Sequence, residues 1–448
     1  MMNALRLRKG FFATLLFCLA AASLWAQDIS YSGKLSALSG LGLPNTHDNK
    51  GEFLTGSLMF DNVFKAYLEE SMFVFNAILI GDSLGSQSTN GLSAFVSDDG
   101  HFSLKLKEAY FDYNGGFIAL RVGRQISAWG KADGIQIADV LCPQDESTVI
   151  ASTYKESRQG IDAVRLSFIG ESIQADAYWI PIFTPSTLPL ASHNPLRKLV
   201  FPERLENVTL DTPSRYDDFD LPKKKIANSE YALRVGLYRP AFDLSFYGFY
   251  GWDDMPFHSY TGTSSVKVGG TYERMAMVGA DAALPVGNFV FRLEGAWFPN
   301  RHTQTSADWQ LAQQQDGKTA SSSEKRHQLL GLVGFDWDPA GGWTITAQYI
   351  ADYVAGSTSE LDRKSYQHQA SLSVEKKLLN ETLTLSGQAF MDLRTLSTNS
   401  ELSAEYSLTD AIKLSLIGNL FLEGPKEEGK YGSLHDLSCV TLKGTISF

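Results

Sequence analysis

The sequence places the side chains best suited to binding chemistry in one short stretch. Arg124, Gln125 and Trp129 come first, and Asp139 and Asp145 follow them. A guanidinium group presents a planar fork of donors, which holds a carboxylate through two hydrogen bonds. An indole ring combines a large apolar surface with one N–H donor, which suits it to anchor a segment against a wall. These residues predict either a loop that is tied down or a contact with an acidic solute.

Arg124 has two alternative roles. It is expected to neutralise a loop acid, Asp133 or Asp139, or to bind the carboxylate of a solute. Long loops that fold inward need such attachments, so the structural role is the expected one, with Trp129 as a second attachment. In either case this loop is the candidate constriction of an enclosed passage.

A second group of charged residues interrupts stretches that otherwise alternate apolar and polar residues. Its basic members are Arg121, Arg165, Arg234 and Arg292, and its acidic members are Asp176, Asp243, Asp281, Glu294 and Asp352. If the apolar face of each stretch meets hydrocarbon, an arginine there would cost about 2–4 kcal/mol. The charges are therefore expected on the opposite face, where walls of both signs orient a polar solute. The alternative is that they pair with one another and plug the interior.

The elements that carry these charges have the pattern of β-strands. The stretches "FDLSFYGFYGW" (242–252), "FVFRLEGAW" (289–297), "WTITAQYIADY" (343–353) and "IKLSLIGNLFL" (412–422) place large apolar residues at every second position. A period of two is that of a strand with one buried face. Runs of about 10 residues match the length of a tilted strand that spans a membrane.

The connections between these stretches alternate in length. Short turns at 114–116, 170–172, 239–241, 285–287, 339–342 and 409–410 separate long polar segments at 83–99, 125–157, 181–226, 253–269 and 299–324. A soluble sandwich has no reason to gather its short turns at one end, whereas an outer-membrane barrel has short periplasmic turns and long external loops. The predicted fold class is all-β, a transmembrane antiparallel barrel of about 18 strands (16–18). Loops 125–157 and 181–226 are expected to fold over or into the lumen.

Tryptophans support the same orientation. Trp179, Trp252 and Trp297 are expected to end strands at the outer interface, while Trp337 and Trp343 flank a turn at the inner one. Two aromatic girdles are typical of barrels whose amphipathic rings meet the lipid headgroups.

The two termini also fit a membrane barrel. Residues 1–26 have the basic start, the apolar run and the small residue at the cut that are typical of a secretory signal peptide. Its removal takes away three basic residues and no acid, so the net charge falls from −11 to −14, which argues against nucleic acid as a partner. At the other end, "VTLKGTISF" alternates up to Phe448, and a final aromatic resembles the signal that outer-membrane assembly machinery recognises.

Residues 104–145 resemble a family of porin-like outer-membrane barrels known as a domain of unknown function. The resemblance is carried by E-A-Y-x-D (108–112), G-R-Q-x3-W-G (123–130) and D-x3-P-x-D (139–145). About a fifth of the chain takes part closely, and Cys142 departs from the small polar residue expected in the last motif. The resemblance implies an outer-membrane barrel and transport, and it names no substrate.

Other chemistry has less support in the sequence. A disulfide between Cys142 and Cys439 is one option in an oxidising compartment and would join the loop to the last strand, but spacing alone does not supply the distance, so the sequence leaves the pairing open. Asp253, Asp254 and His258 form an acid–histidine group of the kind that activates water, but such loop groups are usually solvated surface. No hydrolase or nucleotide-binding motif appears. We expect no enzyme, no cofactor and no metal.

These observations predict a channel of the bacterial outer membrane for small polar or amphipathic solutes, spanning residues 27–448. Two alternatives are an uptake channel for a hydrophobic molecule, admitted through loop 181–201, and a surface adhesin that binds through its loops. The expected partners are outer-membrane lipid, the barrel assembly machinery and a small-molecule solute. Barrels of this size occur singly and as trimers, and the sequence does not choose between a monomer and a trimer.

Overall fold

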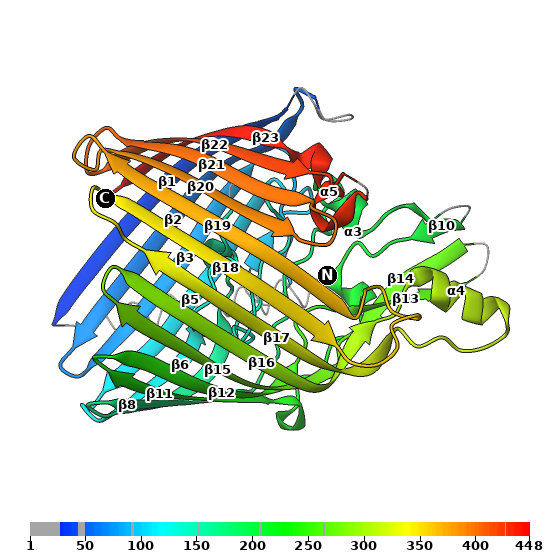
Figure 1. The fold of residues 1–448 in the computed structure, drawn as a ribbon, viewed down its shortest axis with the longest axis horizontal. Helices are drawn as coiled ribbons and strands as arrows, with labels where there is room; N and C mark the ends of the chain where they lie inside the picture. Colours follow the sequence, from blue (N-terminus) through cyan, green and yellow to red (C-terminus); the bar gives the residue numbers. More distant parts are fainter. Residues whose placement is uncertain are drawn as a thin grey trace.

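The computed structural model describes residues 27–43, 50–90, 94–150, 152–205, 208–262, 265–425 and 427–448. The predicted signal peptide, residues 1–26, lies outside these ranges. Within them, antiparallel strands form a closed barrel of 18 strands (Figure 1), which confirms the predicted fold class and strand number. Each strand of the wall pairs with its neighbours in the sequence, so the chain winds once around the cylinder.

The strands that form the wall are listed in chain order. They are β1 (Asp28–Gly42), β2 (Phe53–Leu68), β3 (Ser71–Asp82), β5 (Phe102–Asn114), β6 (Ile118–Gln125), β7 (Ile161–Ile169), β8 (Ile173–Ile180), β11 (Glu230–Arg239), β12 (Phe242–Trp252), β15 (Arg274–Val286), β16 (Phe289–Gln304), β17 (Ser323–Trp337), β18 (Trp343–Val354), β19 (Tyr366–Leu378), β20 (Leu383–Asp392), β21 (Thr398–Ser407), β22 (Ile412–Leu422) and β23 (Cys439–Ser447). The short β4 (Ala94–Val96) pairs with β5 beyond the end of β6.

Alternation along each strand separates an apolar outside from a mixed inside. In β16, Phe291, Leu293 and Trp297 are exposed, whereas Glu294 and Ala296 between them are buried. A protein does not leave large apolar side chains in contact with water around its whole circumference, so this face is suited to hydrocarbon. On the apolar faces predicted for β12, β16, β18, β22 and β23, the large side chains are exposed or half-buried, and none of them is fully buried.

The barrel closes between its first and last strands. β1 pairs with β23, with Lys34 opposite Ser447 and Gly42 opposite Cys439. Phe448 extends the pairing, because its N–H donates to the carbonyl of Gly33 and its carbonyl accepts from the N–H of Gly33, at 3.0 and 2.8 Å. The Phe448 ring covers Gly33 so closely that a Cβ on residue 33 would lie 2.5 Å from it. This closure leaves the wall without a free edge, as a membrane strand requires.

The two ends of the cylinder differ, as the connection lengths predicted. One end carries the short turns 69–70, 115–117, 170–172, 240–241, 287–288, 338–342, 379–382 and 408–411, together with the C-terminus (Figure 1). The other carries the long connections, including 83–101, 126–160, 181–229 and 253–273. One predicted loop is too long: β16 extends to Gln304 and β17 begins at Ser323, so the connection is 305–322 rather than 299–324.

Smaller elements gather at the loop end. A second sheet pairs β9 (Arg204–Leu205), β10 (Val208–Asp211), β14 (Ser265–Thr271) and β13 (Phe257–Thr261), and α4 (Ala307–Gln315) packs beside it. The remaining short helices are α2 (Tyr154–Ser157), α3 (Arg197–Val200), α5 (Gly429–Gly432), η1 (Tyr216–Asp218), η2 (Ile226–Asn228) and η3 (His435–Leu437). No helix in the described ranges is long and apolar enough to cross a membrane, a finding that says nothing of strands in a barrel.

The predicted tryptophan positions are largely correct. Trp179 lies next to the end of β8, and Trp337 and Trp343 flank the turn between β17 and β18. Trp297 does not end its strand, because β16 continues for a further stretch toward the loops. Trp252 ends β12 but is only partly exposed, since it packs against the loop cluster around Phe183.

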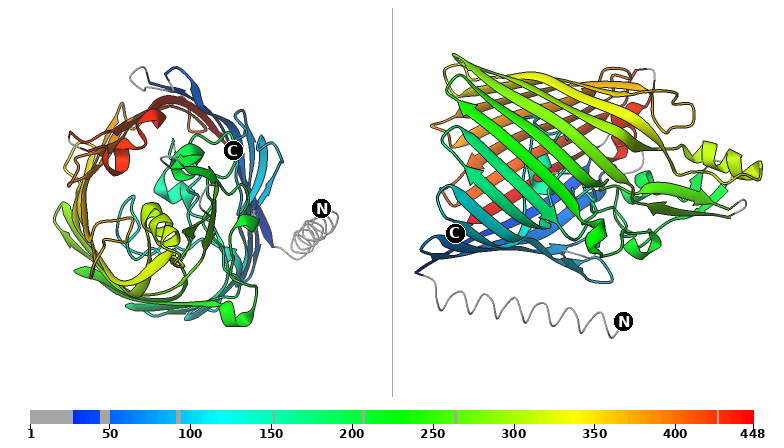
Figure 2. Two further views of the ribbon diagram at one scale, coloured as in Figure 1. Left: turned by 90° about the vertical axis from the view of Figure 1, so that its right-hand side faces the viewer. Right: turned by 90° about the horizontal axis from the view of Figure 1, so that it is seen from below.

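The largest apolar core lies inside the cylinder rather than between two sheets. It joins Trp129, Ile137, Val140, Leu141 and Cys142 of the β6–β7 connection to wall residues such as Tyr247 and Met277. Figure 2 looks along the barrel from the loop end and shows turquoise and green segments within the ring of strands. The β6–β7 connection therefore lies within the lumen and packs against its wall.

Candidate functional site

The β6–β7 connection is attached to the far side of the barrel by one carboxylate. Glu294 of β16 accepts hydrogen bonds from the backbone N–H groups of Lys131, Ala132 and Ala138, at 2.6, 2.8 and 2.8 Å. The Glu294 side chain is buried, so these donors replace the water that its charge would otherwise need. Arg292, two residues earlier on the same strand, donates to the Lys131 carbonyl at 3.1 Å. The two predicted lumen residues of β16 therefore bind the loop.

A second attachment extends the loop further around the wall. The side-chain oxygen of Gln348 in β18 accepts from the N–H of Asp133 at 2.9 Å, and its amide donates to the Asp133 carbonyl at 3.0 Å. Paired bonds of this kind satisfy a backbone segment that has no sheet partner. The loop thus crosses the interior from β6 to β18.

Trp129 anchors the start of this crossing segment. Its ring is 4% exposed and lies 5.0 Å from Tyr247 and 6.0 Å from Tyr178, measured between centroids. These tyrosines belong to β12 and β8, so the indole packs against the inner wall. Its backbone N–H donates to Asp139 Oδ1 at 2.9 Å, which closes the loop upon itself. The contacts are those of a residue that fixes a loop by burying a large ring.

Asp139 is the acid at the centre of the loop. Besides the Trp129 N–H, it accepts from the Tyr154 hydroxyl at 3.0 Å and from Nε of Arg158 at 2.8 Å. The Asp139 side chain is buried, and a buried carboxylate persists only with such partners. Arg158, which the sequence analysis did not single out, is therefore its counter-ion.

Arg124 has a different partner from the two predicted. Its Nε and Nη2 donate to Oδ1 and Oδ2 of Asp162 at 3.0 and 2.6 Å, so neither Asp133 nor Asp139 neutralises it. Asp162 faces Arg124 directly in the β6–β7 pairing. Gln125 is fully buried and donates to the Ala163 carbonyl at 3.1 Å. Both residues join β6 to β7 where the long connection begins.

The remaining charges of the wall mostly form pairs. Arg121 donates to Asp112 at 2.7 Å, Arg165 lies 3.9 Å from Asp176, and Arg292 contacts Asp336. Lys131 of the loop lies 3.9 Å from Asp243. Arg234 differs, since Nη2 donates to the Tyr238 hydroxyl at 2.6 Å and Nε is buried without a hydrogen-bond partner. The wall therefore consists largely of paired charges.

The two cysteines, whose pairing the sequence left open, are not bonded to each other. Cys142 is buried in the lumen core, and its Sγ accepts from the Ser127 N–H at 3.2 Å. Cys439 is buried in a separate cluster with Phe421 and Leu437. Both thiols are free. Burial raises the pKa of Cys142 to about 12, so its thiol stays protonated at neutral pH.

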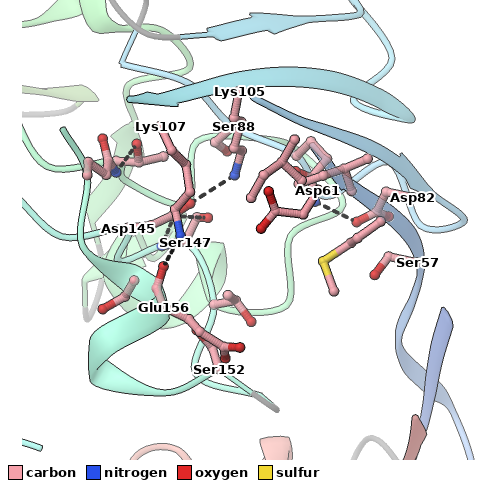
Figure 3. A pocket seen from close by; sticks show the side chains of 18 of the residues that line it. Ser57, Asp61, Asp82, Ser88, Lys105, Lys107, Asp145, Ser147, Ser152 and Glu156 are labelled. Atoms are coloured by element: carbon pink, nitrogen blue, oxygen red, sulfur yellow. Dashed lines mark hydrogen bonds and ion pairs between the residues drawn. The ribbon is translucent and has the colours of Figure 1, made fainter. Parts of the chain in front are cut away.

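A cavity of about 240 Å³ remains between the loop and the first strands (Figure 3). One wall is formed by inward side chains of β1, β2, β3, β5 and β23, and the other by residues 145–160. Asp145 lies at its rim, where Lys105 of β5 binds it at 2.9 Å and the Ser147 N–H donates at 3.1 Å. Burial opposes ionisation of Asp145, but Lys105 and these donors hold its pKa below the ordinary value.

Several cavity residues were missed by the sequence analysis. Lys34, Asp61, Lys107, Glu156 and Lys443 all line it, yet none was singled out. Their position in the alternating pattern could have revealed them. Lys443 lies on the opposite face of β23 from the exposed Val440 and Leu442, and Lys34 lies on the corresponding inner face of β1. The first strands carry weaker alternation, which hid the basic side of the cavity.

Loop 181–226 packs around the entrance at the loop end. The Thr187 N–H donates to the Gln144 carbonyl at 2.9 Å, which ties this loop to the β6–β7 connection. Phe183, Leu188, Leu190 and Phe201 are buried together in one cluster with Tyr216. Most of these apolar side chains are used for packing, while Phe183 and Tyr216 also line a second, smaller cavity of about 220 Å³.

The acid–histidine group does not assemble. His258 lies between Phe201 and Phe219, at 5.4 and 6.3 Å between ring centroids, and burial lowers its pKa to about 4. Asp253 instead accepts from Arg301 at 2.8 Å. Among the residues that the structure describes, no cluster of His, Cys, Asp or Glu is suited to a metal ion.

Comparisons with known proteins agree with this architecture. The family model described as "Protein of unknown function (DUF1302)" matches residues 27–411. No curated protein showed significant similarity. Among solved structures, OccAB1 of Acinetobacter baumannii is similar with a TM-score of 0.51 and 9% identity, covering 95% of this chain and 97% of that one. OccK8 (OprE) of Pseudomonas aeruginosa has a TM-score of 0.50 at 9% identity, covering 95% and 98%. OccAB3 of Acinetobacter baumannii has 0.50 at 10%, covering 94% and 98%. At identities this low, the structural similarity shows a common fold and nothing more.

Proposed function

We propose that this chain, which belongs to the DUF1302 family of proteins of unknown function, is a channel of the bacterial outer membrane for small polar or amphipathic solutes. The observation that carries the proposal is a closed barrel, apolar outside, whose lumen holds a loop beside a charged cavity. An apolar exterior of this kind requires hydrocarbon, and a polar lumen suits solutes that carry water with them.

The β6–β7 connection is the proposed constriction. Contacts with Glu294, Gln348 and the wall tyrosines hold this loop against the barrel. It can therefore narrow the lumen without a stable fold of its own. Arg124, Gln125, Trp129 and Asp139 hold the loop in place, whereas Asp145 borders the cavity. Solutes are therefore expected to pass between residues 145–160 and the wall of β1, β2, β3 and β5.

Polar and amphipathic solutes are favoured over a purely hydrophobic one. The apolar residues of loop 181–201 that would admit a hydrophobic molecule are packed against one another. The cavity, in contrast, is lined by several lysines and carboxylates. A neutral hydrophobic molecule would have to displace water from these charges without forming hydrogen bonds or ion pairs that replace it.

The partners proposed for the chain follow from this location. Outer-membrane lipid would surround the apolar belt, and the assembly machinery would recognise the strand that ends at Phe448. The chain is proposed to act as a monomer or as a trimer. Cross-linking in membranes would separate the two, since only a trimer gives products of two and three chains.

Electrical recording on the refolded protein tests the channel function. We expect discrete conductance steps in KCl across planar bilayers, and swelling of liposomes in sugar solutions. A closed barrel that only binds a partner through its loops would show neither. Barrel folding is checked separately by resistance to SDS before heating, so a silent but folded protein would overturn the proposal.

A further inference from the structure

The cavity between the loop and the first strands is lined by charged residues of both signs. Its basic residues are Lys34, Lys105, Lys107, Arg158 and Lys443. Its acidic residues are Asp61, Asp82, Asp145 and Glu156. The fifth basic residue, Arg158, is the counter-ion of the buried Asp139, so the four lysines face the four carboxylates of the lining.

Several of these charges are already engaged. Lys105 binds Asp145 at 2.9 Å, and Arg158 binds the buried Asp139. Asp82 accepts from the Leu84 N–H at 2.8 Å and from donors of Ser86 and Gln87, so its own turn satisfies it. The groups left for a ligand are three lysines and two carboxylates.

The three lysines lack an ion pair within the described part of the chain. Lys107 donates to the backbone carbonyl of Glu156 at 3.3 Å, and no hydrogen bond is found for the ammonium groups of Lys34 and Lys443 in those same ranges. Burial opposes ionisation of Glu156, yet Lys443, the Thr153 N–H and Lys34 hold its pKa below the ordinary value. All three lysines line the cavity near Glu156: Lys107 contacts its backbone carbonyl, and Lys34 and Lys443 act on its carboxylate.

Apolar side chains lie next to this basic group. One row of paired residues runs across the wall from Lys34 to Asp61 to Ile78 and ends at Lys105. The next inward row pairs Met59 of β2 with Ile80 of β3. Met59, Ile78 and Ile80 thus form an apolar strip that the lysines border. A volume of about 240 Å³ is room for about eight water molecules, which is the size of a small organic acid.

Building on the channel function proposed above, we propose that this cavity is a binding station for a small amphipathic monoanion, such as an aromatic carboxylate. Its anionic group would replace water at Lys34, Lys107 and Lys443, and its apolar body would cover Met59 and Ile80. Three lysines face two carboxylates, Asp61 and Glu156, so a single negative charge fits better than two. Lysine binds an anion as a mobile point charge, which permits entry and release.

Benzoate is the probe for this site, added to the refolded full-length protein in planar bilayers that carry KCl current. We expect benzoate to interrupt the current at concentrations about tenfold below those of benzamide, its neutral counterpart, because charged contacts are typically worth at least that factor. Acetate, which lacks the apolar body, should also be a weaker blocker. K34Q, K107Q and K443Q should each raise the benzoate concentration needed for half-block, measured against each variant's own KCl current without benzoate. K413Q is the matched control, because Lys413 pairs with Glu405 on β21, away from the cavity.

The outcomes separate the two proposals. A folded protein without current overturns the channel function and this inference together. A channel that benzoate and benzamide block equally overturns the anion site alone, and this comparison needs no variant to fold. Stronger block by the zwitterion 4-(aminomethyl)benzoate would overturn the assignment to a monoanion, because it would place Asp61 and Glu156 among the ligand's contacts.

Discussion

The carboxylate of Glu294 occupies the space that a side chain on residue 130 would need. A Cβ on Gly130 would lie 2.4 Å from Oε1 of Glu294. Gly130 also has a φ of 79°, a left-handed conformation that other residues rarely adopt. The wall acid and the loop glycine therefore fit one another, and together they let the N–H donors of Lys131, Ala132 and Ala138 converge on one carboxylate.

Replacing Glu294 by Gln should loosen the constriction. An amide oxygen is a weaker acceptor than a carboxylate, so the attachment should lose about 2–3 kcal/mol. We expect a larger and noisier single-channel conductance in KCl. Glu405→Gln is the control, because Glu405 pairs with Lys413 and does not contact the loop. Equal conductance for both variants would contradict the role assigned to Glu294.

Replacing Trp129 by Ala should release the loop to proteases. Removing a buried indole typically costs about 3–5 kcal/mol, and here the loss falls on the loop rather than on the strand ladder. We expect trypsin to cut after Lys131 much faster than in the unmodified chain. Trp343→Ala, on the exposed face of β18, should change nothing at this site. Protection of Lys131 in both variants would show that Trp129 does not anchor the loop.

Reversing Arg234 should change ion selectivity. This arginine forms no ion pair within the described ranges, so Arg234→Glu changes the lumen charge without breaking one, although it sets a carboxylate opposite Asp176. The reversal potential in a KCl gradient should move toward cation preference. Arg215→Glu, in the loop at the outer end, serves as the comparison. Identical reversal potentials would place Arg234 outside the conducting path.

Acid should open the contact between Lys105 and Asp145 only at low pH. The pKa of Asp145 is lower in the folded state than in the unfolded one. Its ionised carboxylate therefore contributes fully to folded-state stability above the unfolded pKa of about 3.9, and this stability is lost as pH falls through the folded pKa. Conductance and trypsin resistance should therefore stay constant from about pH 7 to pH 5 and change below about pH 4. Asp145→Asn should lack this step. A transition centred near pH 6 would point to another group.

The two cysteines should behave as protected thiols. With the pKa of Cys142 near 12, a maleimide should not label it at pH 7 unless the barrel is first unfolded. Cys142→Ser and Cys439→Ser should both assemble, and a reducing agent should leave electrophoretic mobility unchanged. A mobility shift on reduction would mean that the thiols meet in the cell after all.

Strand positions were predictable because two constraints act on every residue of the wall. A membrane strand must alternate, and its outer face must be apolar, so Phe291, Leu293 and Trp297 were assigned to the correct face of β16. Nearly every wall strand pairs with the strands next to it in the sequence, so the order of the chain alone predicts which strands are neighbours. The fold could therefore be derived largely from local patterns.

The partners of individual site residues could not be derived in the same way. Arg124 pairs with Asp162 because the register of β6 and β7 sets them opposite each other, and register does not follow from composition. Glu294 binds residues 131–138, far away in sequence, since the loop crosses the lumen. Lys34 was missed because the first strands carry weak alternation, and Lys443 was missed although its strand alternates clearly, because the pairing that brings β23 beside β1 does not follow from either strand alone.

The pairing of β1 with β23 makes neighbours of the two strands that lie farthest apart in the chain. Any incomplete set of strands has two unpaired edge strands. Each exposes a row of backbone N–H and C=O groups that lipid cannot hydrogen-bond, and leaving each group unsatisfied costs several kcal/mol. Insertion should consequently be all-or-none, and the growing sheet should stay out of the lipid until β23 pairs with β1. A chain shortened by one hairpin at either side would then be degraded in the periplasm rather than inserted as a narrower pore.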